Sequence, residues 1–168
     1  MTRSFDFNRA LVQKYDLPGP RYTSYPTAPQ FHQAFAVDDY QQAAAASNQA
    51  ATPKPLSLYI HIPFCKSLCY YCACNKIITQ KTHRAAEYLS YLKREIAMQA
   101  ALFDRSRTLT QLHLGGGTPT YLTREQLADL MDCLHQAFVM DDSDNHEFSI
   151  EVDPRTIDTE QIQTLRRL

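Results

Sequence analysis

The sequence predicts an α/β fold in which parallel strands alternate with helices. From residue 56 onward, strand-like alternation and helix-like spacing of apolar residues follow one another three times. Helical segments separate every pair of strands, and such a crossover is what joins parallel neighbours in one sheet. An antiparallel sheet with one solvated face is the alternative, and the intervening helices argue against it.

Residues 1–55 are predicted to be an N-terminal extension that ends in a linker. The stretch 19–27 is rich in proline and tyrosine and cannot form a regular helix, because its prolines lack the backbone donor and clash with the preceding turn. Asp38 or Asp39 is expected to cap a short alanine-rich helix. The segment TPKP at residues 52–55 is typical of a stiff linker.

Residues 56–168 are predicted to form three βα units. The apolar spacing of each helix is that of one buried stripe, and Thr123 with Gln126 has the pattern of a capping box. Asp158 with Gln161 opens the last helix in a similar way. Strands are expected at 56–62, 109–114 and 147–152, and helices at 82–103, 123–138 and from 158 to the end of the chain.

Each predicted strand has one aliphatic face and one polar or aromatic face. Buried parallel strands usually consist of nearly continuous apolar runs, so this alternation is unusual. If the aliphatic faces meet the helices, the polar faces line a concave ligand chamber rather than the packed core of an ordinary (βα)8 barrel. The residues on the polar faces are Tyr59, His61, Gln111, His113, Ser149, Glu151 and Asp153.

The composition argues against several classes of protein. With a net charge of −1, the chain has no excess of basic residues that would favour binding to nucleic acid. The longest apolar run covers residues 43–46 and is far too short to insert into a membrane, and residues 1–15 lack the apolar block of a signal peptide. An odd number of cysteines, five, clustered in a chain without a secretion signal favours a reducing, cytoplasmic location and a metal site.

Four of these five cysteines lie within ten residues, and the first three, Cys65, Cys69 and Cys72, have the spacing C-x3-C-x2-C. Thiolates bind soft metals, so zinc and iron–sulfur are the candidates. A structural zinc site usually takes two separated C-x2-C pairs, and this chain has no second pair. Three thiolates on a four-iron cluster leave one iron open to a substrate or cofactor. The spacing favours that cluster, with a zinc-binding interaction module as the alternative.

Four motifs follow one another along the chain: PRYTSYPT at residues 20–27, YIHIPFC at 59–65 with the two cysteines after it, GGGTPT at 115–120, and IEVDPR at 150–155. Together they resemble the oxygen-independent coproporphyrinogen III oxidases, a family of radical S-adenosylmethionine (SAM) enzymes. The resemblance runs from about Phe5 to the last residue. It implies a partial (βα) radical SAM barrel, with the first half of that barrel at residues 56–168.

The resemblance also implies roles for single residues. Cys65, Cys69 and Cys72 would ligate a [4Fe-4S] cluster, and SAM would chelate its open iron. Cys74 belongs to the loop of this family but is not carried over as a ligand. The implied SAM-binding residues are Tyr59, Gly116 and Gly117 (whose backbone can approach the cofactor closely), Thr118, Glu151 (toward the ribose) and Tyr71 (against a second SAM or the substrate).

The implied reaction is the oxidative decarboxylation of coproporphyrinogen III propionates to vinyl groups, which gives protoporphyrinogen IX in haem biosynthesis. It uses a 5′-deoxyadenosyl radical and an electron donor that the sequence does not identify. Arg21 and Arg155 are candidate partners for the anionic propionates. A haem-binding chaperone that shares the radical SAM loop is the rival, and Cys74 and the segment 20–27 argue against it. Since three units cannot close a barrel, we expect a piece of a longer protein, without turnover by itself.

Overall fold

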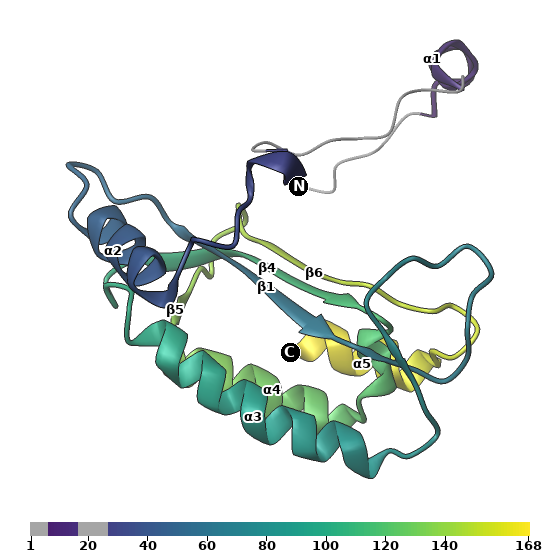
Figure 1. Cartoon of the computed structure of the whole chain (residues 1–168). Coiled ribbons are helices and arrows are strands. Elements are labelled where there is room, and N and C mark those ends of the chain that lie inside the picture. Colours follow the sequence, from purple (N-terminus) through teal and green to yellow (C-terminus); the bar gives the residue numbers. More distant parts are fainter. Residues whose placement is uncertain (1–6, 17–26) are drawn as a thin grey trace. The chain divides into compact units, whose positions relative to one another are not determined.

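The computed structural model describes residues 7–16 and 27–168 of the chain (Figure 1). Two compact units, residues 1–37 and 38–168, are described separately. The first contains helix α1 (Arg9–Tyr15) and the short 3-10 helix η1 (Ala28–Gln30). Asn8 caps α1, because its side chain accepts a hydrogen bond of 3.0 Å from the backbone N–H of Leu11. Apart from Thr27, the stretch 19–27 lies outside the described residues.

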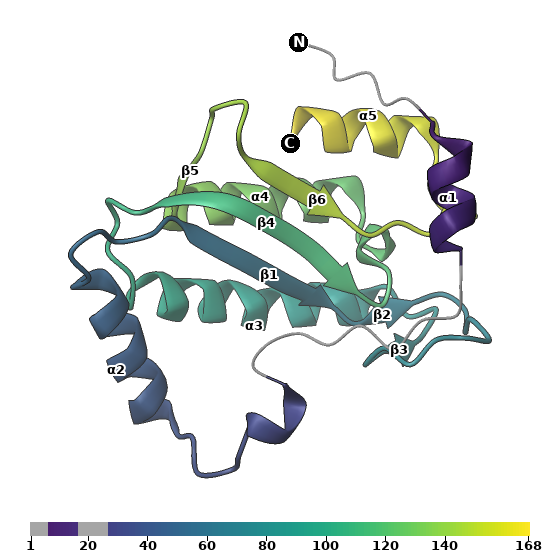
Figure 2. The same cartoon turned by 90° about the horizontal axis from the view of Figure 1, so that it is seen from above.

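The second unit is built on a parallel sheet whose central strand is β4 (Figure 2). β1 and β6 flank β4, and the short β5 pairs with the beginning of β4. The predicted parallel α/β arrangement is therefore confirmed, and the antiparallel alternative is wrong. The strands are β1 (Leu56–Ile62), β4 (Thr108–Gly116), β5 (Val139–Met140) and β6 (Glu147–Ile150).

Two long helices, α3 (His83–Ala100) and α4 (Arg124–Ala137), cover one face of this sheet (Figure 1). The aliphatic faces of the strands meet them, as predicted, and form one hydrophobic cluster. Burying such side chains is the main source of stability for an α/β layer. The cluster includes Ile60, Ile62, Leu112 and Leu114 from the strands, and Leu89, Ile96, Leu127, Leu130 and Leu134 from the helices.

The helix caps follow the sequence closely. Thr123 and Gln126 form the expected capping box at the start of α4, with hydrogen bonds of 3.2 and 3.0 Å. The side chain of Asp158 accepts a 2.7 Å bond from the backbone N–H of Gln161 and opens α5 (Thr159–Arg167). The prediction that Asp38 or Asp39 caps the alanine-rich helix is wrong, because this helix, α2 (Val37–Asn48), begins before both residues. Both carboxylates lie in its first turn, where the helix dipole still favours them.

Other helix and strand boundaries differ from the predicted ones by a few residues. α3 ends at Ala100 rather than at 103, because the backbone tightens there into a turn in which the N–H of Leu102 bonds to the carbonyl of Gln99 (3.0 Å). β4 is longer than predicted at both ends, and β6 ends at Ile150. The N–H of Glu151 still bonds to the carbonyl of Leu114 (2.9 Å), so the backbone leaves the sheet just after it.

Arg107, in the turn before β4, connects α2 to the sheet. Its guanidinium donates to Ser47 Oγ and Asn48 Oδ1, both at 2.8 Å, and to the carbonyl of Lys54 at 2.9 Å. α2 therefore contacts the sheet unit, although its composition placed it in the N-terminal extension. The domain boundary at residue 55 stays a prediction. In the ranges 7–16 and 27–168, no helix combines the length and the apolar character needed to cross a membrane.

Truncation of Leu130 tests the packing of this core. The side chain of Leu130 is fully buried between α4 and the sheet. We expect Leu130→Ala to lower the free energy of unfolding by about 2–5 kcal/mol, because it removes apolar contacts and leaves a cavity. Met98→Ala is the control, since Met98 is 70% exposed on α3. Urea unfolding followed by circular dichroism checks both, and equal losses for the two variants would contradict this packing.

Candidate functional site

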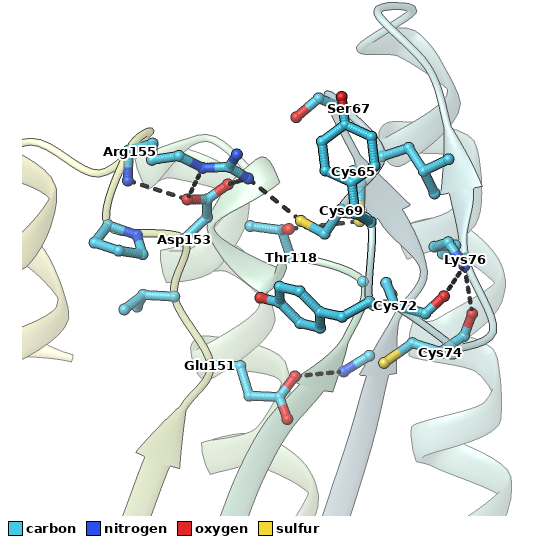
Figure 3. Close-up of a pocket in the computed structure, with 17 residues that line it drawn as sticks. Cys65, Ser67, Cys69, Cys72, Cys74, Lys76, Thr118, Glu151, Asp153 and Arg155 are labelled. Carbon is cyan, nitrogen blue, oxygen red and sulfur yellow. Dashed lines mark hydrogen bonds and ion pairs between the residues drawn. The ribbon is translucent and has the colours of Figure 1, made fainter.

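A cavity of about 770 Å³ lies where the carboxyl ends of β1, β4 and β6 meet (Figure 3). Ligands of open parallel sheets bind at this edge, because the segments that follow each strand converge there. Three segments line the cavity: the cysteine loop after β1, the glycine-rich turn after β4, and residues 151–155 after β6. They come from parts of the chain that are far apart in the sequence.

The cysteine loop is closed at its base by a pair of short parallel strands. These are β2 (Phe64–Cys65) and β3 (Ile77–Ile78). The N–H of Ile77 bonds to the carbonyl of Pro63 (2.7 Å), and the N–H of Thr79 bonds to that of Cys65 (3.0 Å). The chain therefore returns beside its own starting point, and the cysteines lie on a closed loop. The sequence pattern showed no sign of these two-residue strands.

Two basic side chains fix the second half of the loop. Lys76 Nζ donates to the carbonyls of Cys72 and Cys74, each at 3.2 Å. His61 Nε2 lies 2.8 Å from the carbonyl of Asn75, and a carbonyl only accepts, so this nitrogen carries the proton. In the neutral ring Nδ1 then accepts from the hydroxyl of Tyr59 at 3.0 Å. This contact joins the polar face of β1 to the loop.

Each of the first three cysteine sulfurs receives a hydrogen bond from a different place. Thr118 Oγ1 donates to Cys65 Sγ at 3.5 Å, and Arg155 Nη2 donates to Cys69 Sγ at 3.3 Å. A hydrogen bond from the backbone of Cys74 lowers the pKa of the Cys72 thiol, and the charge of Lys76 adds to this effect. Hydrogen bonds to sulfur favour the thiolate, which is the form that binds metals.

The fourth cysteine of the loop differs from the other three. Its hydrogen bond to Cys72, followed by the negative charge of Cys72, raises the pKa of the Cys74 thiol. The two thiols of this pair are thus shifted in opposite directions. All four loop cysteines are free thiols in the structure.

The first three cysteines of the loop share the lining of one cavity. Across the described ranges, no three His, Cys, Asp or Glu side chains gather closely enough to hold one metal ion. A tetrahedral zinc needs its sulfur ligands about 2.3 Å from one point. A four-iron cluster is larger, so its thiolate ligands lie further apart around a shared space. Cys65, Cys69 and Cys72 all line one cavity, which is the arrangement to test for such a cluster.

The glycine-rich turn packs tightly against the start of the cysteine loop. The N–H of Gly117 bonds to the carbonyl of Ile62, and that of Thr118 bonds to the carbonyl of Phe64, both at 2.9 Å. A Cβ on Gly117 would lie 2.7 Å from the oxygen of Pro63 and 2.9 Å from Cys65 Sγ. Glycine is therefore required here for the approach of two backbones. Its predicted contact with a cofactor stays a prediction.

Glu151 is held in place within the cavity. Its Oε2 accepts a 3.1 Å hydrogen bond from the N–H of Gly116, a residue whose φ of 119° favours glycine. Its Oε1 lies 3.6 Å from His113 Nε2, and His113 Nδ1 pairs with Ser149 Oγ at 2.8 Å. The ring of Tyr59 stacks on that of His113, with centroids 5.8 Å apart. The polar faces of the three strands thus form one connected network.

The structure brings eight of the nine predicted site residues to the lining of this cavity, and Tyr59 lies beside it on β1. Tyr71 is 90% exposed at the rim.

The sequence did not reveal three supporting contacts, those of Lys76, of His61 with Asn75, and of Arg155 with Asp153 and Cys69. His61 carried a signal, because its strand position placed it on the polar face. The propionate candidate Arg21 lies outside the described residues. The eight lining residues are Cys65, Cys69, Cys72, Tyr71, Gly116, Gly117, Thr118 and Glu151.

Comparisons with known proteins identify relatives of this chain. Residues 59–168 match the family model of the radical SAM superfamily. The chain is 48% identical to the oxygen-independent coproporphyrinogen III oxidase of Escherichia coli strain K12 over 98% of its own length and 34% of that protein. It is 48% identical to the protein of that name from Pseudomonas aeruginosa, over 94% of this chain and 34% of the relative. A third relative of that name, from Mannheimia haemolytica, is 52% identical over 86% of this chain and 94% of the relative.

A solved structure shares the fold. It is the coproporphyrinogen III oxidase of Escherichia coli, described as a radical SAM enzyme, with a TM-score of 0.76 and 46% identity. The match covers 96% of this chain and 34% of that structure. The chain therefore spans about a third of the length of the Escherichia coli and Pseudomonas relatives.

Alanine at Gly117 tests the close contact between the glycine turn and the cysteine loop. We expect Gly117→Ala to destabilise the fold by about 1–3 kcal/mol, because its Cβ would collide with backbone and with Cys65. Gly115→Ala is the matched control, since the atoms nearest to its Cβ belong to the side chains of Tyr59 and His113 rather than to backbone. Denaturant unfolding measures both. A smaller loss for Gly117→Ala than for Gly115→Ala would contradict the proposed contact.

Proposed function

This chain belongs to the radical SAM superfamily and, within it, to the oxygen-independent coproporphyrinogen III oxidase family, and we propose that it is the part of such an enzyme that holds the cluster and SAM. The whole protein would decarboxylate the propionates of coproporphyrinogen III oxidatively to vinyl groups, giving protoporphyrinogen IX. The observation that carries the proposal is the placement of three hydrogen-bonded thiols from one loop around one cavity.

In this proposal Cys65, Cys69 and Cys72 hold three irons of a [4Fe-4S] cluster and leave the fourth iron for SAM. When bound, the cluster and SAM together supply a 5′-deoxyadenosyl radical that can abstract hydrogen from a substrate carbon. The protein contributes position and shelter rather than the redox chemistry itself. The hydrogen bonds to the three sulfurs orient these ligands before any metal binds.

The residues next to the thiols suit the rest of SAM. The carboxylate of Glu151, held by the N–H of Gly116, faces the cavity as an acceptor for ribose hydroxyls. Thr118 stands beside Cys65 and closes that wall. In this proposal Tyr59 on the strand and Tyr71 at the rim offer aromatic faces, that of Tyr71 to a second SAM or the substrate.

The partners of the whole protein are part of the same proposal. Coproporphyrinogen III is the substrate, an electron donor reduces the cluster, and the location is the cytoplasm. Arg155 is already engaged by Asp153 and Cys69, so the structure gives no support to its pairing with a propionate. A haem-binding chaperone would differ in one observable: it would retain haem and form no protoporphyrinogen.

Serine in place of each proposed ligand tests the cluster. After anaerobic reconstitution with iron and sulfide, we expect about four irons per chain in the unmodified protein. Cys65→Ser, Cys69→Ser and Cys72→Ser should each lose most of this iron, because an alcohol is a far poorer ligand for iron than a thiolate. Iron and sulfide analysis, together with the visible absorption of the cluster, provides the measurement.

Two other cysteines serve as controls for that experiment. Cys133→Ser, on α4, and Cys74→Ser should keep the cluster, since neither sulfur is a proposed ligand. Iron loss in Cys74→Ser equal to that in Cys72→Ser would contradict the assignment of ligands. One equivalent of zinc without iron or sulfide in the unmodified protein would instead favour the zinc-binding module.

A further inference from the structure

Arg155 makes an unusually well-defined contact with one of the cysteines. Its Nε and Nη2 donate to Asp153 Oδ1 and Oδ2 at 2.9 and 2.8 Å, a bidentate pair. The same Nη2 donates to Cys69 Sγ at 3.3 Å (Figure 3). The backbone N–H of Arg155 also bonds to Asp153 Oδ1 at 3.0 Å. The guanidinium plane is thereby fixed with one edge toward the sulfur.

We propose that Arg155, clamped by Asp153, is a positioning residue for the Cys69 thiolate and raises the reduction potential of the cluster that this thiolate helps to hold. The inference rests on the proposed function, because it requires the cluster. Hydrogen bonds to ligand sulfurs are among the main protein influences on cluster potentials. A donor that also carries a positive charge favours the reduced cluster, which holds one more electron.

The three thiols differ in their hydrogen-bond donors. Cys65 receives a neutral hydroxyl from Thr118, and Cys72 receives a backbone donor together with the ammonium group of Lys76. Cys69 receives a hydrogen bond from the guanidinium of Arg155. Arginine keeps its charge at every accessible pH, and its planar fork presets the direction of the bond. The effect on the potential is therefore built into the loop after β6.

A measurement of the cluster potential tests this role. We expect Arg155→Gln to shift the midpoint potential to a more negative value, by about 59 mV, which is a tenfold change in the equilibrium constant for a one-electron couple. Arg155→Lys keeps the charge but loses the bidentate fork, so its shift should be smaller. The readout is a redox titration of the reconstituted chain followed by electron paramagnetic resonance, which a purely structural role would not move.

Arg124→Gln is the matched control. Arg124 also pairs with a carboxylate, Glu160, and its pair lies outside the cavity. The midpoint potential of Arg124→Gln should equal that of the unmodified chain. A shift as large as that of Arg155→Gln would overturn the inference. An unchanged midpoint potential in Arg155→Gln would overturn the inference too, even if this variant bound porphyrinogen more weakly. If that variant takes up no cluster, Arg155→Lys decides in the same way. Failure of the unmodified chain to take up a cluster would instead contradict the proposed function.

Discussion

The site depends on the parallel register of β1, β4 and β6. Ile62 pairs with Gly116, and Leu114 pairs with Ile150, so the three strands end at one edge of the sheet. Backbone hydrogen bonds continue past the strand ends, from Gly117 to Ile62 and from Glu151 to Leu114. This register brings the donors Thr118 and Arg155 to sulfurs that lie 53 and 86 residues away in the sequence.

Hydrophobic packing on the opposite face maintains that register. The side chains of a strand alternate between faces, so a slip of one residue would turn Ile60 and Ile62 to solvent and the polar face to the helices. Both isoleucines are buried against the helix layer, which makes such a slip costly. The same alternation directs Tyr59 and His61 toward the network around His113 and Glu151. The hydrophobic core and the polar network beside the site thus lie on opposite faces of one sheet.

Local sequence patterns predicted much of this structure, but they did not predict the contacts between segments that are distant in the sequence. The alternation of Leu56 to Ile62 and the cap at Thr123 depend on neighbouring residues, and the structure agrees with both. The cysteine spacing led directly to the candidate ligands. In contrast, the β2–β3 pair and the bond from Arg155 to Cys69 depend on where distant segments come together. No periodicity predicts such long-range contacts, and the sequence indicated Arg155 only as a candidate partner for a propionate.

The central claim is that three cysteines hold an iron–sulfur cluster with one iron left open for SAM. Electron paramagnetic resonance of the reduced, anaerobically reconstituted chain, recorded before and after SAM is added, tests this claim most directly. We expect the signal of a [4Fe-4S] cluster whose g values change when SAM binds, because a new ligand reaches one iron. A cluster signal that SAM leaves unchanged, with SAM in excess, would contradict it.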